Sequence, residues 1–413
     1  MVYTLMQSSM KFSAKLSLRK YFISSVQNSP QTSELKMSKM RIGVIGCGNI
    51  SMTYMRNAAL FNNIELTACA DIIPETAAKR AAEYGISAMT AEQLLASPTV
   101  DIVLNLTVPT EHYPVTKAAL EAGKHVFTEK PLAVSTELGS KLVALAAEKG
   151  LALASAPDTF LGAAGRKAHN LINDGCLGPI IGGTAYMMGH GMEHWHPAPS
   201  FYYQEGAGPI LDMGPYYIAM LLSLLGPANQ VFAMTSIGNK NRTITANGPN
   251  KGTSFGVTTE TTAMAVIRFA SGAIVNLGIS WDVWAQGHPY IELYGRDGSL
   301  RLPDPDTYGG DLLYSDHGGD WQTFKSEDSL LGVINWPYDA PRIANYRTTA
   351  VAEMADAIVN KRKPRATGSN ALHVLEILEA ILKSGRTNAP VEIKSSYELM
   401  TAMPDKDIIR LLA

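Results

Sequence analysis

Residues 42–51 read Ile-Gly-Val-Ile-Gly-Cys-Gly-Asn-Ile-Ser, a short apolar run that ends in two closely spaced glycines. The run 42–45 predicts a buried strand, followed by a helix to about Phe61 and a second strand over 64–70. A strand–helix–strand unit with glycines in its first turn is typical of a doubly wound parallel sheet. This stretch therefore predicts an α/β, Rossmann-type domain for the N-terminal part of the chain.

The same alternation of strand and helix continues to about residue 156. Apolar runs at 102–106, 124–127 and 151–154 predict further strands, and the segments 74–84, 91–96, 114–122 and 135–149 predict helices. After residue 156 the pattern changes to alternating runs at 261–269, 273–281 and 290–294, separated by turn residues. We expect a Rossmann domain over 40–156 and, over 157–413, an α+β domain with a large, open, mostly antiparallel sheet that binds substrate and forms oligomers.

Composition narrows the class of protein. The formal net charge is −2 and only 17% of the residues are charged, so no basic face for nucleic acid is apparent. No run of eighteen apolar residues is present, which argues against a membrane span. Three scattered cysteines indicate reduced thiols and a cytoplasmic location. Residues 1–39 carry six Lys or Arg against one Glu, and we expect a disordered extension or a targeting segment.

The glycine turn predicts a dinucleotide site. Gly46 permits the tight turn, and Gly48 lets the backbone approach a pyrophosphate at the helix N-terminus, although Ser51 takes the place of the third glycine. Asp71, at the end of the next strand, would bind the ribose hydroxyls and repel a 2′-phosphate, so NAD is favoured over NADP. The predicted cofactor contacts here are Gly46, Cys47, Gly48, Asn49, Ile50, Asp71 and Ile72. The alternatives are a plain strand-to-helix turn and an N-cap role for Asp71.

A lysine between an acid and a proline, in Glu129-Lys130-Pro131, ends a later strand of the same domain. A free lysine has a pKa of roughly 10.4, too high for a base at neutral pH. Burial and a positively charged nicotinamide ring would lower that pKa, so that Lys130 takes a proton from an alcohol as hydride leaves. Without a dinucleotide beside it, Lys130 would be an ordinary surface lysine at a strand end.

The chain resembles the Gfo/Idh/MocA oxidoreductases, named after glucose-fructose oxidoreductase and inositol dehydrogenase. The resemblance rests on the glycine turn, on segments 107–112, 119–126 and 129–133, and on 206–208, 211–214 and 380–384. It implies further cofactor contacts at Thr107, Pro109, His112, Glu129 and Lys130, and it places Lys130 between the nicotinamide ribose and the substrate hydroxyl. The family's second signature is an aspartate with a histidine four residues later, whereas here Asp212 is followed by Tyr216. We therefore expect Lys130, Asp212 and Tyr216 to be catalytic, unless Tyr216 is a packed helix aromatic.

A loop rich in histidine and aromatic residues precedes Asp212. Its side chains suit stacking on a sugar ring and hydrogen bonding to hydroxyls. The predicted substrate contacts are His190, His194, Trp195 and His196 from this loop, and Asp158 from the domain junction. A metal site is the alternative for the loop, but the chemistry implied by the resemblance needs no metal, and a surface loop remains open. Asp158 would equally suit a helix cap.

These observations predict an NAD-dependent oxidoreductase that acts on a secondary alcohol of a sugar, polyol or sugar derivative. The alternatives are an NAD-dependent glycoside hydrolase that works by transient oxidation and elimination, and a non-catalytic NAD-binding protein. The resemblance also implies a homo-oligomer, a dimer or tetramer, because an open sheet face needs covering.

Overall fold

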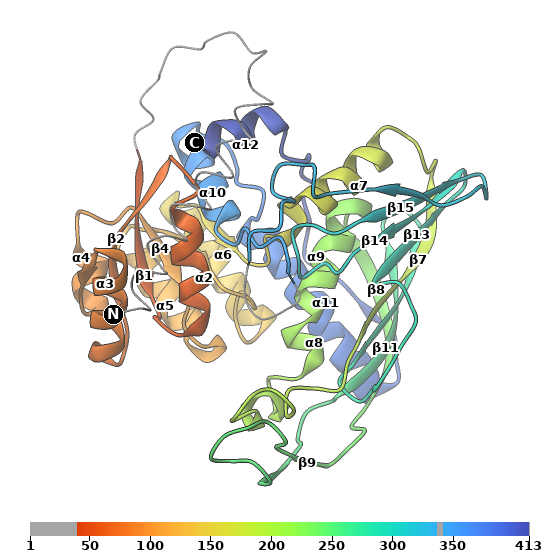
Figure 1. The fold of residues 1–413 in the computed structure, drawn as a ribbon, viewed down its shortest axis with the longest axis horizontal. Coiled ribbons are helices and arrows are strands. Elements are labelled where there is room, and N and C mark those ends of the chain that lie inside the picture. The colour runs from red at the N-terminus through yellow and green to blue at the C-terminus, as the bar shows by residue number, and fades with distance from the viewer. Residues whose placement is uncertain (1–38, 337–341, 413) are drawn as a thin grey trace.

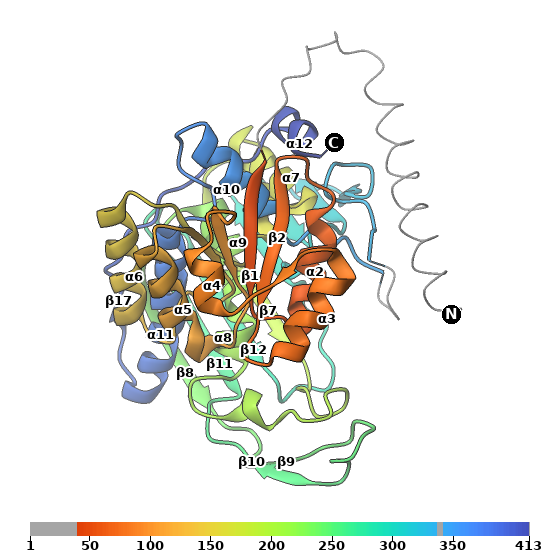
Figure 2. The same cartoon turned by 90° about the vertical axis from the view of Figure 1, so that its left-hand side faces the viewer.

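The structure, a computed structural model, describes residues 39–336 and 342–412, so all of the N-terminal extension except Lys39 lies outside the described residues. A six-stranded parallel sheet organises the first part of the chain (Figures 1 and 2), which confirms the predicted Rossmann-type domain. Its strands, in spatial order, are β3 (Ser87–Ala88), β2 (Ile64–Ala70), β1 (Met40–Ile45), β4 (Ile102–Asn105), β5 (His125–Thr128) and β6 (Leu153–Ser155). The connecting helices are α2 (Asn49–Ala58), α3 (Pro74–Tyr84), α4 (Ala91–Ala96), α5 (Pro109–Glu121) and α6 (Thr136–Lys149).

Helix α5 is the largest departure from the predicted boundaries in this domain. It begins at Pro109 rather than at Pro114, because Pro109 occupies the first helical turn, where its missing N–H costs nothing. Pro114 then lies inside the helix and leaves the carbonyl of Thr110 without its usual partner. Thr110 is exposed, so water can satisfy that carbonyl.

The second sheet has nine strands and is mostly antiparallel, as predicted. In spatial order they are β16 (Gln322–Phe324), β15 (Leu312–Asp316), β14 (Gly298–Leu302), β13 (Ile291–Gly295), β7 (Ile180–Met188), β12 (Ile274–Ser280), β11 (Thr262–Phe269), β8 (Ala228–Ser236) and β17 (Val391–Glu392). Only the β7–β12 pair is parallel among the described strands of this sheet. A separate hairpin, β9 (Asn241–Thr243) with β10 (Ser254–Gly256), projects at one end of the molecule (Figures 1 and 2).

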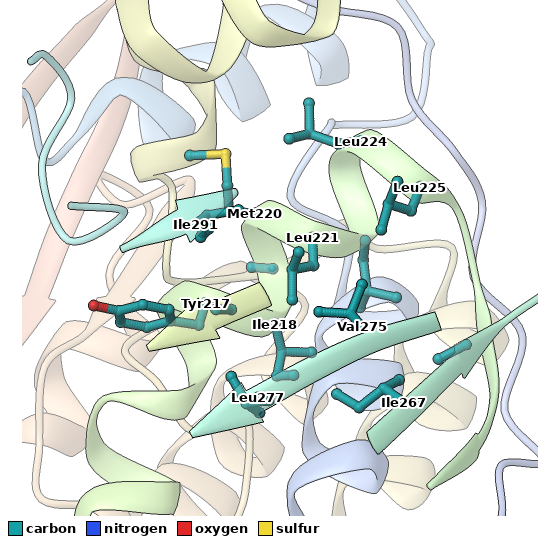
Figure 3. Packing of buried hydrophobic residues seen from close by; sticks show 14 of the residues in the cluster. Tyr217, Ile218, Met220, Leu221, Leu224, Leu225, Ile267, Val275, Leu277 and Ile291 are labelled. Carbon is teal, nitrogen blue, oxygen red and sulfur yellow. The ribbon is translucent and has the colours of Figure 1, made fainter. Parts of the chain in front are cut away.

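Helices cover one face of this sheet. They are α7 (Ala163–Asn173), α8 (Pro209–Asp212), α9 (Gly214–Leu225) and α11 (Gly368–Thr387). Every residue of α9 is buried, and Figure 3 shows Ile218 and Leu221 packed over Val275 and Leu277 of β12. Because full burial of one such side chain contributes about 1.5–3 kcal/mol, this core anchors α8 and α9 on the sheet. Asp212, at the end of α8, is thereby placed on a rigid support.

The opposite face of the sheet carries exposed apolar side chains. Strands β8 and β11 alternate between buried and exposed residues, and Met234 faces Met264 while Phe232 faces Val266 across the strand pair. All four of these side chains are at least 44% exposed. Within residues 39–336 and 342–412, no helix packs on this face, which Figure 1 shows at the right of the molecule.

The chain returns to the first domain near its C-terminus. Helices α10 (Thr349–Val359) and α12 (Asp405–Leu411) share one hydrophobic core with β1 and α2. Asn57 donates a hydrogen bond to the carbonyl of Asn345 at 2.9 Å, and Thr348 donates one to the carbonyl of Tyr54 at 2.8 Å. Thr348 has φ +104°, a conformation rare for a β-branched residue, so these contacts hold an otherwise unfavourable backbone. They place the neighbouring Arg347 at the domain junction.

Candidate functional site

The glycine turn leaves open space at the start of α2. Gly46 has φ +97°, and a Cβ there would lie 2.5 Å from the carbonyl oxygen of Leu106. At Gly48, by contrast, a Cβ would meet nothing within 4 Å. Gly48 is the N-cap of α2 and no side chain caps the helix, so its first N–H groups remain available to an anion. Ser51, in the third glycine's place, is buried, and its hydroxyl bonds to the carbonyl of Gly48 at 2.6 Å.

Asp71 braces the turn from the adjacent strand. Its Oδ2 accepts a hydrogen bond from the backbone N–H of Cys47 at 2.7 Å, and its Oδ1 accepts one from Ile73 at 2.9 Å. Each carboxylate oxygen has a second lone pair, so Asp71 can still accept bonds from ribose hydroxyls. Ile72 is 97% exposed and offers an apolar surface beside the carboxylate. Open space, free N–H donors, an acid and an apolar platform together fit a dinucleotide without a 2′-phosphate.

The predicted contacts after β4 have different roles. Thr107 is half-buried, and its hydroxyl donates to Asn105 at 2.7 Å, while Pro109 is exposed in the first turn of α5. His112 is buried, and its ring nitrogens lie 2.6 Å from the carbonyl oxygen of Pro131 and 3.0 Å from that of Thr107. Burial lowers its pKa. The side chain of His112 is therefore enclosed and ties two loops together, and its contact with the cofactor stays a prediction.

Lys130 lies at the end of β5 and reaches into the second domain. Its Nζ is 2.7 Å from Oδ1 of Asp212 and 2.8 Å from the carbonyl oxygen of the same residue. The two side chains are 15% and 25% exposed, so the pair is sheltered but still accessible. Glu129 is buried, accepts a bond from the Tyr54 hydroxyl at 2.7 Å, and accepts one from the Lys130 N–H at 2.9 Å. The segment that follows β5 is therefore fixed by Glu129, through Tyr54, and by Lys130, through Asp212.

The charge state of Lys130 differs from the sequence-based expectation. Burial lowers the pKa of Lys130, but the negative charge of Asp212, with smaller contributions from Tyr216 and Glu129, outweighs burial and raises that pKa above its usual value. Lys130 is therefore an ammonium in the protein alone. In this form it is a proton donor to a substrate oxygen, and it becomes a base only when another positive charge is brought close to it.

Tyr216 also lies beside Lys130, although a break at Met213 separates α8 from α9. The Nζ of Lys130 is 5.3 Å from the centre of the Tyr216 ring. The Tyr216 hydroxyl accepts a hydrogen bond from Nη2 of Arg347 at 3.2 Å, and the same nitrogen is 2.5 Å from Oδ1 of Asp306. Burial and the charge of Asp306 raise the pKa of Tyr216, so it is a hydrogen-bonding group and not a base. Sequence patterns did not identify Arg347 or Asp306, because neither belongs to a local motif.

A second aspartate in this network titrates near neutral pH. Burial and the charge of Asp306 raise the pKa of Asp304 from 3.8 to about 6. The folded state disfavours the charged form of Asp304 and therefore favours the protonated form. The stability that the protonated carboxyl contributes is fully present below pH 3.8 and is lost as the pH rises through about 6. We expect Asp304→Asn to gain about 3 kcal/mol relative to the wild type between pH 4 and pH 7.

Urea unfolding of both proteins at several pH values measures this difference. Asp320 is exposed and makes Asp320→Asn a matched control for the change from Asp to Asn itself. A difference that is constant from pH 4 to pH 7 in the Asp304 variant would contradict the assignment.

The histidine loop contains both enclosed and exposed residues. His190 stacks on Trp284 with ring centres 3.4 Å apart, and its Nδ1 is buried without a hydrogen-bond partner. Burial lowers the pKa of His190. His194 and Trp195 are exposed, and His196 is half-buried with its Nδ1 accepting a bond from Ala198 at 3.1 Å. The rings of Trp195 and His196 are in contact with each other. Trp195 is 55% exposed and can meet a ligand, whereas one face of the His190 ring is covered by Trp284.

Asp158 has a structural position. It is 1% exposed, accepts a hydrogen bond from the Tyr308 hydroxyl, and accepts another from the N–H of Ala350 at 2.9 Å. Ala350 lies in the first turn of α10, so Asp158 caps that helix from another domain segment. Both carboxylate oxygens of Asp158 are thus occupied and its side chain is enclosed, while substrate binding by Asp158 stays a prediction.

The described residues contain neither a membrane-spanning helix nor a cluster of metal ligands. No helix among them is long and apolar enough to span a membrane. No group of three or more His, Cys, Asp or Glu side chains in the same residues is arranged to hold a metal ion. The three cysteines are all free thiols.

Comparison with known proteins agrees with this geometry. Residues 40–156 match the family model described as an oxidoreductase family with an NAD-binding Rossmann fold, and residues 166–301 match the GFO/IDH/MocA C-terminal domain. The 1,5-anhydro-D-fructose reductase of Ensifer adhaerens is 28% identical over 86% of this chain and 99% of its own length. The levoglucosan dehydrogenase of Pseudarthrobacter phenanthrenivorans is 25% identical over 64% of this chain and 73% of its own length.

A solved structure has the same fold. Levoglucosan dehydrogenase in complex with NADH superposes with a TM-score of 0.75 at 21% identity, over 87% of this chain and all of that one. The two domain matches cover most of the described chain and include the glycine turn, Lys130 and Asp212. The chain therefore belongs to the Gfo/Idh/MocA oxidoreductase family, and it is an NAD-binding oxidoreductase.

Proposed function

We propose that this protein transfers a hydride between NAD and a carbon that carries a secondary alcohol or its ketone in a sugar, polyol or sugar derivative. The observation that carries the proposal is the Lys130–Asp212 pair, a sheltered ammonium held at 2.7 Å beside the carboxyl edge of the Rossmann sheet. The relatives named above act on anhydrofructose and levoglucosan. Both are carbohydrates, and their names support this class of substrate.

NAD, when bound, supplies the hydride acceptor or donor. The residues that would hold it are the α2 N-terminus at Gly48, Asp71 and the exposed Ile72. In the reducing direction the Lys130 ammonium would donate its proton to the carbonyl oxygen. In the oxidising direction it would first have to lose that proton to solvent, which the positive charge of bound NAD would favour, and the neutral amine would then receive the alcohol proton. Asp212 fixes the orientation of Lys130 and favours its protonated form.

Tyr216 takes the place of the family's histidine as a hydrogen-bond donor to the substrate oxygen. Its oxygen already accepts a bond from Arg347, so its own proton is free to be donated. Its pKa is raised, which keeps that proton in place at neutral pH. Lys130 therefore carries the proton transfer, and Tyr216 positions the oxygen that receives it.

Domain roles follow from the same arrangement. Residues 40–156 would bind NAD, while residues 157–413 would supply Asp212, the histidine loop and an oligomer interface. The exposed apolar strip on β8 and β11 suits a second copy of the chain, forming a dimer or tetramer. Light scattering on the wild type measures the mass, and a monomer at micromolar concentration would refute this interface.

The free thiols favour a reducing, cytoplasmic compartment, and fractionation of cells that make the protein would check that location.

A substrate screen tests the activity. The purified protein, with NAD, is incubated with free sugars, inositols and aryl glycosides, and both NADH absorbance and released phenol are followed. We expect NADH to accumulate with at least one carbohydrate. Phenol release that requires NAD but yields no net NADH would instead indicate the glycosidase alternative, and absence of both signals would contradict the proposal.

A further inference from the structure

Four aromatic side chains lie in contact with one another in the segment that precedes Asp212. They are Tyr202, Phe201, His196 and Trp195, which we call the aromatic shelf. Ring centres are 4.1 Å apart for Phe201 and Tyr202, 5.5 Å for Tyr202 and His196, and 5.4 Å for His196 and Trp195. Trp195 and Phe201 are 55% and 56% exposed. Large aromatic surfaces of this kind are unusual on a protein unless they bind something.

Backbone hydrogen bonds connect the inner end of the shelf to Asp212. The N–H of Gly208 donates to the carbonyl of Tyr202 at 2.9 Å, and the N–H of Asp212 donates to the carbonyl of Gly208 at 3.0 Å. Burial raises the pKa of Tyr202, and the charges of Asp212 and Lys130 also act on it, as expected for close neighbours. The shelf therefore begins at the reaction site and extends outward from it.

A buried ionic network holds the shelf loop in place. Arg242, on β9, is 4% exposed, and its Nη1 donates to Oε1 of Glu193 at 2.5 Å. Its Nη2 contacts Oδ1 of Asp282 at 2.5 Å, next to the end of β12. Oε2 of Glu193 accepts a bond from the Tyr203 hydroxyl at 2.5 Å. These charges are too far into the protein to meet a substrate, and their effect is to fix a loop between residues 190 and 203.

The segment that carries the aromatic shelf lies near the end of the Rossmann sheet where a coenzyme binds. Figure 2 shows β1 running from its start near the top of the molecule toward the end where β9 and β10 lie. The carboxyl edge of a doubly wound sheet is where such proteins bind their ligands. The lobe formed by the shelf loop and the β9–β10 hairpin therefore lies at the coenzyme-binding end of the molecule.

We propose that the aromatic shelf binds a second sugar ring, so that the substrate is a disaccharide or another glycoside and not a free monosaccharide. The flat C–H faces of a sugar ring pack on aromatic faces, and neighbouring imidazoles hydrogen-bond its hydroxyls. Tyr202 is the member of the shelf that the charges of Lys130 and Asp212 reach, whereas Trp195 contacts His196 and is 55% exposed, so it offers a separate surface for a second ring. A rigid shelf binds without an ordering cost, which raises affinity for the longer substrate. This inference rests on the proposed function.

The test compares kcat/KM for two groups of substrates with NAD, followed by NADH absorbance. The glycosides are cellobiose, maltose, sucrose and trehalose, and the free compounds are glucose, galactose and myo-inositol. For the wild type we expect the best glycoside to exceed the best free compound at least about tenfold. Trp195→Ala should remove that advantage, because it lowers the value for the glycosides about tenfold, as expected for the loss of one stacking contact, and lowers the value for the free compounds less.

Two further variants complete the comparison. Trp195→Phe keeps an aromatic face and should retain most of the advantage. Trp321 is 36% exposed on the distant β15–β16 connection, so Trp321→Ala is a matched control and should change neither value.

Several results would overturn the inference alone: a preference for free sugars, an equal loss for both groups in Trp195→Ala, or a change of oligomer mass in Trp195→Ala with unchanged kinetics, which would assign the shelf to a second copy. No NADH from any compound would overturn the proposed function itself, together with the shelf.

Discussion

Lys130→Ala is expected to lower kcat by at least about a hundredfold while the affinity for NAD stays within about twofold. Lys130, held by Asp212 at 2.7 Å, is the group that we propose exchanges a proton with the substrate oxygen. The methyl side chain of alanine cannot exchange a proton. Binding of NAD should persist, because the glycine turn and Asp71 lie on other strands. Single-turnover kinetics and titration of the protein with NADH, monitored by fluorescence, measure the two quantities separately.

Two other variants calibrate the Lys130 result. The Lys117 side chain is 44% exposed and forms an ion pair with Glu121 at 2.6 Å, so Lys117→Ala should leave both quantities unchanged. Tyr216→Phe should cost less than Lys130→Ala, about tenfold in kcat, because it removes the hydroxyl's hydrogen bonds to Arg347 and to the substrate oxygen but leaves Lys130 to transfer the proton. If Lys130→Ala retains wild-type turnover, or loses NAD affinity as strongly as turnover, Lys130 is not the acid/base.

Gly48→Val is expected to weaken NAD binding by at least about thirtyfold, equivalent to about 2 kcal/mol. Its side chain would fill the space at the α2 N-terminus that the pyrophosphate needs. The fold should tolerate it, because φ is −68° and a Cβ meets no atom within 4 Å, so the loss of stability should not exceed about 1 kcal/mol. Calorimetric titration with NAD and a thermal melt measure the two effects.

Gly46→Ala is the comparison for Gly48→Val, because it should lower the stability of the fold, whereas Gly48→Val should lower the affinity for NAD. A Cβ at φ +97° is strained and would lie 2.5 Å from the Leu106 carbonyl, so we expect a loss of stability of about 3 kcal/mol. Equal affinity for NAD in Gly48→Val and the wild type would show that the pyrophosphate does not bind at this turn.

Local patterns were sufficient wherever one short segment contains the whole signal. The bounds of α3 and α4 agree with the predicted 74–84 and 91–96, because periodicity and caps lie inside each segment. Helix α5 differed because two prolines competed for the first turn, and sequence alone did not decide between them. Short strands such as β3 and β17 escaped detection, since two residues carry no periodicity.

The candidate site shows the same division between local and long-range information. The glycine turn, Lys130 and Asp212 were recognised from motifs, and the structure brings Lys130 and Asp212 together although they are 82 positions apart. For His112 and Asp158 the sequence predicted ligand contacts, whereas the structure shows both side chains buried and hydrogen-bonded within the protein. Arg347 was missed because its role depends on packing of the C-terminal segment against the first domain.

By itself, the sequence determined the Rossmann-type sheet and the preference for NAD, since each rests on residue types at short, characteristic spacings, whereas Lys130 and Asp212 were singled out through the resemblance to the family. Only the tertiary structure decided the charge state of Lys130, the partners of Tyr216 and the continuity of the aromatic shelf with Asp212. Those properties depend on which charges and surfaces meet across the fold, because Coulomb interactions and desolvation act through space and not along the chain.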